Sequence, residues 1–80
     1  MERKLFATAC CLDAQIRYYL LAEAERYGVG LEYRGEEIAL SGLTTIRHQA
    51  EGLLEAMARG RVTPVTACDI AEDWIRAGEW

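Results

Sequence analysis

The stretch from Arg59 to Thr66 (RGRVTPVT) most constrains the fold, because one amphipathic helix is predicted to end within it and another to begin. Apolar residues before it recur at the spacing of one helix face: Ile46, Ala50, Leu53, Leu54, Met57 and Ala58. Gly60 lies where a helix end favours a positive φ, and Pro64 prevents the first helix from continuing. The sequence therefore predicts two helices joined by a tight turn.

The second helix has two possible starts. Thr66 and Asp69 have the spacing of a capping box. Alternatively, Thr63 caps the helix and Pro64 occupies its first position. Gly78 is expected to end the helix, and the side chains predicted to face a core are Ala67, Ile70, Ala71, Trp74 and Ile75.

Short apolar and alternating runs fill the first half of the chain, and these predict strands. The run Lys4–Leu12 (KLFATACCL) is apolar on both faces, which predicts a buried strand. Residues 29–41 alternate apolar and polar side chains on both sides of the turn Arg34-Gly35-Glu36. This alternation predicts a β-hairpin with one buried face.

The segment Gln15–Arg26 fits two structures. Its composition, rich in Leu, Ala and Glu, favours a helix, which would give the order β-α-β-β-α-α. A strand is the alternative, because every second residue from Ile16 to Ala24 is apolar. Local sequence alone favours the helix.

Four short motifs bear on this choice: Tyr18-Tyr19-Leu20-Leu21, Tyr27-Gly28-Val29, Val62-Thr63-Pro64-Val65 and Glu72-Asp73-Trp74-Ile75. In this order the chain resembles, over residues 15–76, a family of short bacterial proteins, mostly from anaerobic Gram-positive bacteria, known only as a domain of unknown function. The resemblance implies that the Tyr-Tyr-Leu-Leu segment is a strand. We therefore expect an α+β fold, an antiparallel meander of three to four strands packed on one face by two C-terminal helices. The family carries no known catalytic or ligand residues, so the resemblance implies no site.

Length, charge and cysteine content limit the kinds of protein to which the chain can belong. Eighty residues predict a single domain, 1–80. A net charge of −4 without a basic stripe argues against direct binding of nucleic acid. Three cysteines, an odd number, favour the cytoplasm over a secreted disulfide framework. No apolar run approaches membrane-spanning length, so we expect no membrane partner.

Metal, thiol and acid–base chemistry each have few candidate residues. Cys10, Cys11, Cys68 and His48 lack metal-ligand spacing, and adjacent strand residues point to opposite faces. One histidine cannot supply a nucleophilic triad. The paired carboxylates Glu36-Glu37 and Glu72-Asp73 are expected to be solvated. We therefore expect no enzyme activity, no cofactor and no metal.

These patterns favour a non-catalytic cytoplasmic interaction module that acts through a sheet face or edge, on a protein partner or as a homo-oligomer. The reason is the run Leu5–Leu12, which would leave apolar side chains on an uncovered face. An alternative is an inhibitor from a phage or mobile element, similar to anti-CRISPR proteins, that binds a basic protein surface. Residues 63–80 hold four acids and one base, which suits such a surface. A thiol- or zinc-dependent protein is the third hypothesis.

Overall fold

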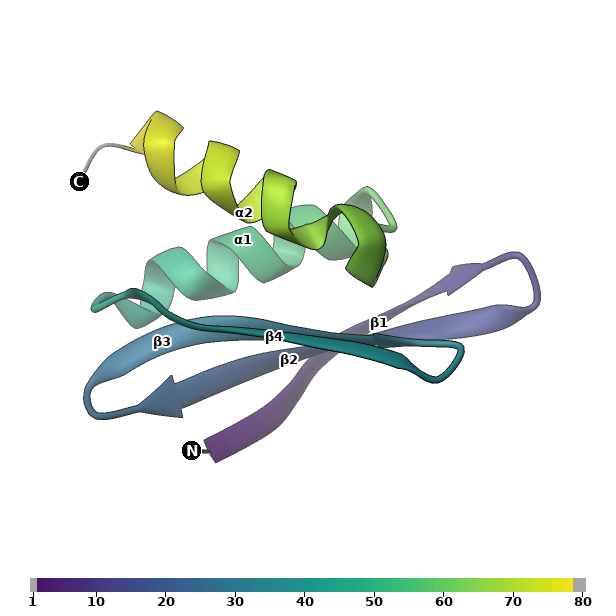
Figure 1. Ribbon diagram of the computed structural model, residues 1–80, viewed down its shortest axis with the longest axis horizontal. Coiled ribbons are helices and arrows are strands. Elements are labelled where there is room, and N and C mark those ends of the chain that lie inside the picture. The colour runs from purple at the N-terminus through teal and green to yellow at the C-terminus, as the bar shows by residue number, and fades with distance from the viewer. Residues whose placement is uncertain (1, 79–80) are drawn as a thin grey trace.

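The computed structural model describes residues 2–78, which form a four-stranded antiparallel sheet and two helices on one of its faces (Figure 1). The strands follow one another across the sheet as a meander. They are β1 (Glu2–Cys11), β2 (Ala14–Glu23), β3 (Arg26–Tyr33) and β4 (Glu36–Thr44), and the helices are α1 (Arg47–Arg59) and α2 (Pro64–Gly78). The predicted α+β meander with two C-terminal helices is confirmed.

The ambiguous segment Gln15–Arg26 is mostly strand, so the helix favoured by local sequence is wrong. β2 lies between β1 and β3 and pairs with both. The packing of its apolar side chains under the helices, together with pairing on both sides, overrides helix propensity. The turn that follows β2 is at Ala24 and Glu25, whose φ values of 51° and 65° fit a two-residue type I′ turn.

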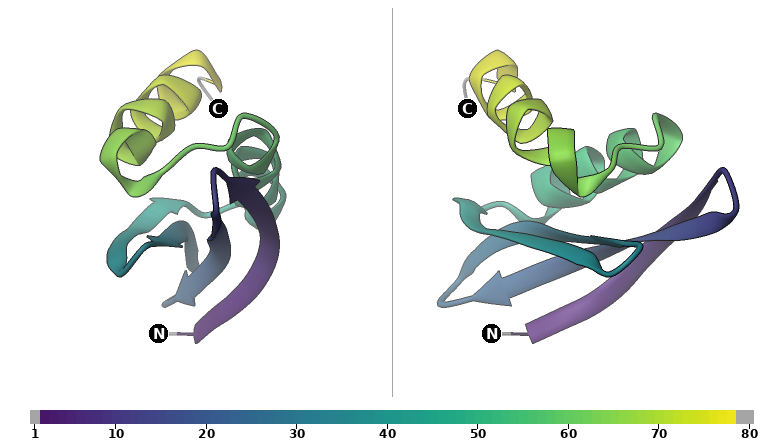
Figure 2. Two further views of the ribbon diagram at one scale, coloured as in Figure 1. Left: turned by 90° about the vertical axis from the view of Figure 1, so that its right-hand side faces the viewer. Right: turned by 45° about the vertical axis from the view of Figure 1, so that its right-hand side comes forward.

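The core lies between the inner face of the sheet and the two helices. α1 lies over β1, β2 and β3, whereas α2 covers β3 and β4 (Figure 2). The buried side chains are Ile16, Tyr18, Leu20, Val29, Leu31, Ala50, Leu53, Leu54, Met57, Ala67 and Ala71.

Some side chains predicted to be in the core lie at its margin or outside it. Ile46 and Ile70 are exposed, because Ile46 precedes the first turn of α1 and Ile70 lies on the outer side of α2. Ala58 and Trp74 are partly buried against the core. The side chain of Ile75 lies outside the described part of the structure.

The junction between the helices confirms the predicted turn but corrects two of its details. The residue with positive φ is Arg61, at 52°, whereas Gly60 has a φ of −89°. The Val62 N–H donates to the Met57 carbonyl at 2.9 Å and the Arg61 N–H to that of Ala58 at 3.2 Å. This bonding pattern is a Schellman motif, which places the left-handed residue one position after Gly60. α2 begins at Pro64, the second of the two predicted starts.

Candidate interaction surface

β1 is an edge strand whose far side pairs with no other strand in residues 2–78. It was predicted to be buried, and this is wrong, because none of its residues is fully buried. Only the inward side chains Ala7, Ala9 and Cys11 pack against the core. Leu5 is 53% exposed and Phe6 is 37% exposed. The apolar run therefore forms a surface at the margin of the sheet.

The free side of β1 presents backbone hydrogen-bonding groups. Cys11 and Ala14 flank the two-residue turn at Leu12 and Asp13 and are paired in the register. Residues that flank such a turn exchange hydrogen bonds with each other, and the direction of the backbone groups then alternates along the strand. The N–H and C=O groups of Ala9 thus point toward β2. Those of Thr8 and Cys10 point toward the free side, where a further strand can bind.

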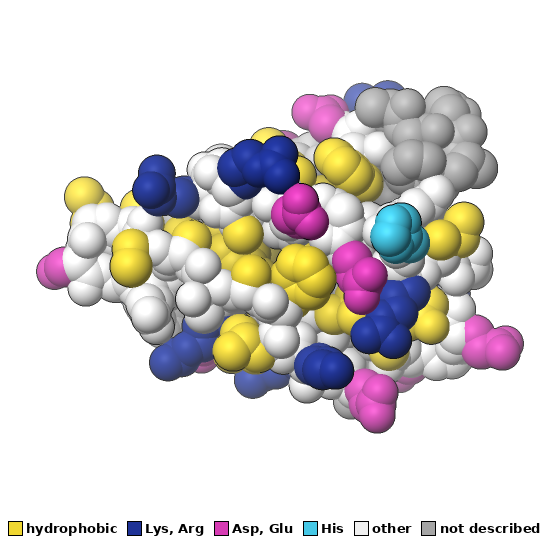
Figure 3. Space-filling view, turned by 180° about the vertical axis from the view of Figure 1, so that it is seen from behind, with side chains coloured by type: hydrophobic (Ala, Val, Ile, Leu, Met, Phe, Trp, Pro, Cys, Tyr) yellow, Lys and Arg dark blue, Asp and Glu magenta, His cyan; other side chains and the backbone are white. Residues whose placement is uncertain are grey.

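An apolar band lies beside this edge. The register of β1 against β2 shifts between Leu5 and Ala7, so Phe6 is the extra residue of a β-bulge. A hollow of about 410 Å³ separates Phe6 from Trp74 and from the exposed side of α1. Seen from behind, apolar side chains gather along this face, bordered by charged side chains (Figure 3). Apolar area and free backbone groups therefore occur together along β1.

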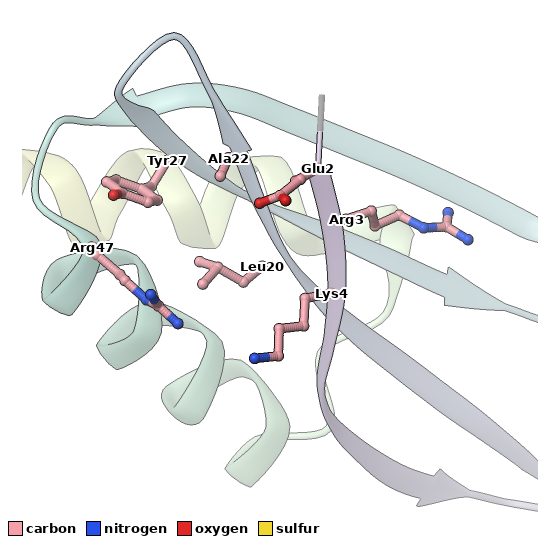
Figure 4. A pocket seen from close by; sticks show the side chains of 7 residues that line it. All are labelled: Glu2, Arg3, Lys4, Leu20, Ala22, Tyr27 and Arg47. Atoms are coloured by element: carbon pink, nitrogen blue, oxygen red, sulfur yellow. The ribbon is translucent and has the colours of Figure 1, made fainter.

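The first end of β1 carries charges of both signs. A hollow of about 470 Å³ lies there, and the side chains of Glu2, Lys4 and Arg47 point toward it, whereas Arg3 points away (Figure 4). The Arg47 Nε donates to Glu51 at 3.0 Å. Lys4 has no ion pair with any residue of the described chain, so its charge is available to a partner.

The outer face of the sheet is closed by charged side chains and is not an open apolar face. The Arg3 guanidinium lies 4.2 Å above the centre of the Tyr19 ring and binds Glu37 at 2.9 Å. Leu21 lies on this face and is nevertheless only 2% exposed. Leu21 packs flat on the sheet beside Gly30, which pairs with Tyr19, and its Cδ2 lies 3.5 Å from where a Cβ atom of residue 30 would be. Of the two expected surfaces, sheet face and sheet edge, the edge is the apolar one.

The candidate metal and thiol residues lie on separate elements. Cys10 and Cys11 are on β1, His48 is on α1 and Cys68 is on α2. Cys10, Cys68 and His48 are exposed, and Cys11 is half-buried. Within residues 2–78, no three His, Cys, Asp or Glu side chains lie close enough together to hold a metal ion.

The paired carboxylates are at the surface, as expected, and two of them form ion pairs. Glu37 binds Arg3, and Asp73 lies 3.8 Å from Arg76 on the same helix. Glu36 and Glu72 are exposed. These four carboxylates do not face one another across a cleft. Trp80 lies outside the described residues.

The model of a family of unknown function (DUF6514) matches residues 4–77, nearly the whole of the chain. The chain belongs to this family. No curated protein and no solved structure matches it. The expected membership of a family of unknown function is thereby confirmed, and the fold it implied for the Tyr-Tyr-Leu-Leu segment is the one observed. Neither helix of the described chain is long and apolar enough to cross a membrane.

The sequence placed Thr8 and Leu12 within the apolar run Leu5–Leu12, but it did not single out Lys4, Thr8 or Leu12 as residues of this surface. Leu12 was included in the strand, but it is the first turn residue, with a φ of 58°, and it is 87% exposed. The order of the strands held a usable signal. In a meander the first strand is always an edge, so the predicted topology already placed one side of Lys4–Leu12 next to solvent.

Proposed function

We propose that the protein is a non-catalytic interaction module that binds another protein by adding a strand to the free edge of β1. The observation that carries this proposal is the exposure of Leu5 and Leu12 on either side of the free backbone groups of Thr8 and Cys10. Main-chain hydrogen bonds supply affinity in such strand addition, and alternate side chains supply specificity.

The composition of the edge supports the same function. Natural edge strands are usually guarded against pairing by charged side chains or proline. From Leu5 to Leu12 the chain has neither. The β-bulge at Phe6 is the one such device, and it lies toward the first end of the strand, which leaves residues 7–11 in regular pairing with β2. A long, uncharged edge of this kind is expected to pair with another strand.

The chemistry of β1 also defines its partner. A strand that fills this edge should be uncharged and apolar at its centre, opposite Ala7 to Cys11. It should carry a carboxylate where it passes Lys4, whose ammonium group has no ion pair among residues 2–78. All three cysteines are free thiols, which supports an intracellular, reducing location for such a complex.

A second candidate function, favoured by a separate observation, is inhibition of a basic protein surface, as expected for a phage or mobile-element inhibitor. α2 exposes Asp69, Glu72 and Asp73, and the one ion pair among them in the described chain is the 3.8 Å contact of Asp73 with Arg76. Binding through these carboxylates would weaken steeply as salt is added. Strand addition at β1 would depend much less on salt.

A photo-cross-linking amino acid at Thr8 tests the first proposal in cells that make the protein. We expect protein adducts at Thr8 and none at Val65, which is 76% exposed but lies on α2. The adducts at Thr8 should be lost when Cys10→Pro removes an N–H group from the free side of β1. Equal capture at both positions, or no capture at Thr8, would refute strand addition.

A further inference from the structure

We infer that the strand bound at this edge is β1 of a second copy of the chain, paired antiparallel about a two-fold axis at Ala9. This inference rests on the proposed function and names its partner. Pairing of two identical strands closes after two copies, because each copy uses the same surface. Pairing of β1 with the other sheet edge, β4, would leave free edges and extend without limit.

The backbone permits this arrangement. A two-fold axis at Ala9 places Thr8 of one copy opposite Cys10 of the other, and the same pair recurs on the other side of the axis. Thr8 and Cys10 are the residues whose N–H and C=O groups point to the free side of β1. Each pair can therefore exchange two hydrogen bonds, with Ala9 between them as a non-hydrogen-bonded pair.

The exposed side chains match in the same register. Leu5 and Phe6 share one place in the ladder because of the β-bulge. Leu12 of the second copy then lies opposite Leu5 and Phe6. Leu12 is 87% exposed, so this contact covers the most exposed large apolar side chain in residues 2–78. Burial of apolar area is the main driving force of such association.

The regular part of β1 favours the axis at Ala9 over its neighbour. With the axis at Ala9, both pairs of Thr8 and Cys10 lie within residues 7–11, which pair regularly with β2. An axis at Thr8 would instead place Cys10 of one copy opposite the bulged residues Leu5 and Phe6 of the other. A β-bulge disrupts the local ladder, so the axis at Ala9 is favoured.

The shape of the molecule leaves room for the second copy. The turn that joins β1 to β2 projects beyond the junction of α1 and α2 (Figure 1), and the turned view shows the same (Figure 2). Leu12 and Asp13 form this turn. Two hairpins can therefore pair side by side in one continuous sheet, with the helices of both copies on the same face.

Sedimentation equilibrium of the full chain from about 10 to 500 µM tests the inference. We expect a monomer–dimer equilibrium that Leu12→Gly weakens at least tenfold. Glycine adopts the positive φ of Leu12 freely, so the monomer should keep its circular dichroism spectrum. Val65→Ala removes a similarly exposed apolar side chain from α2 and should change the dissociation constant less than twofold. Equal effects of the two substitutions would overturn the inference.

Introduced charges test the register itself. Thr8 and Cys10 are exposed and face each other across an axis at Ala9. Thr8→Glu with Cys10→Lys should therefore strengthen the dimer, and Thr8→Lys with Cys10→Lys should weaken it. A dimer that the Glu and Lys variant does not strengthen overturns the axis at Ala9. A monomer at every concentration overturns the self-pairing. Cross-linking of Thr8 to a different protein would then still support the proposed function, so the two failures are distinguishable.

Discussion

The hydroxyl of Tyr18 donates a hydrogen bond of 2.7 Å to the backbone carbonyl oxygen of Val62. Tyr18 is in the middle of β2 and has no exposed surface, and Val62 follows the left-handed residue that ends the first helix. One bond thus joins the centre of the sheet to the junction of α1 and α2. It fixes the position of the helical layer over the sheet, and hence how much of β1 that layer covers.

We expect Tyr18→Phe to lower the free energy of unfolding by about 1–2 kcal/mol, because the partly buried Val62 carbonyl loses its partner. Urea unfolding followed by circular dichroism measures this change. Tyr27→Phe is the matched control. Tyr27 is half-buried on the same sheet face, and its hydroxyl donates no hydrogen bond within residues 2–78. A loss of similar size in both variants would show that the bond to Val62 is unimportant.

Stability should fall at alkaline pH in a way that depends on Tyr18. Burial raises the pKa of its hydroxyl to about 12, with a smaller contribution from Cys11. In the unfolded chain a tyrosine ionises near pH 10. The contribution of Tyr18 is therefore complete below about pH 10 and is lost between about pH 10 and 12, by about 2–3 kcal/mol. Urea unfolding from pH 8 to 11.5 should show a steeper decline for the wild type than for Tyr18→Phe. Parallel curves would contradict this.

The local sequence predicted the strands that have a clear alternating pattern. It did not predict the strand whose structure depends on pairing with its neighbours in the sheet. The alternation on both sides of Arg34-Gly35 predicted the hairpin of β3 and β4. Gln15–Arg26 did not reveal its structure by itself, because its helix-forming residues are held in a strand by neighbours on both sides. The family resemblance predicted the strand that local propensity did not predict. It predicted only the fold, because the family has no known site residues.

Two glycine positions of β3 differ in how much space they leave for a side chain. A Cβ atom at Gly28 would lie 2.0 Å from the carbonyl oxygen of Leu40, because β4 approaches closely at its irregularity. At Gly30 the nearest atom would be 3.5 Å away, on Leu21. We expect Gly28→Ala to destabilise the fold by about 3 kcal/mol and Gly30→Ala to change stability little. Thermal unfolding of the two variants gives the comparison, and similar melting temperatures would contradict the close approach of β4.

The junction provides a stabilising substitution. Arg61 holds a φ of 52°, which disfavours any residue with a side chain. Arg61→Gly should raise the free energy of unfolding by about 0.5–1 kcal/mol. Gly60→Ala should cost nothing, because Gly60 has an ordinary negative φ. Calorimetry measures the melting temperatures of both variants. If Gly60 were the residue with positive φ, Gly60→Ala would be destabilised and Arg61→Gly would not be stabilised.

The candidate site was predictable only in part. The apolar run up to Leu12 indicated apolar side chains at the surface, and Leu5, Phe6 and Leu12 are exposed. It could not show that Ala7, Ala9 and Cys11 pack against the core whereas Leu5 is exposed. That division depends on the β-bulge at Phe6, which places Leu5 on the outer face beside Tyr19. The outer sheet face also required the structure, since Arg3 and Glu37 meet across it from opposite ends of the meander.

Amide hydrogen exchange of Thr8 and Cys10, measured by NMR at low and high protein concentration, shows whether β1 accepts a strand. We expect both amides to exchange as free groups in dilute protein and to become protected as pairs form. The amide of Ala9, which bonds β2, should be protected at both concentrations. Exchange of Thr8 and Cys10 at an unprotected rate throughout would contradict strand pairing at this edge.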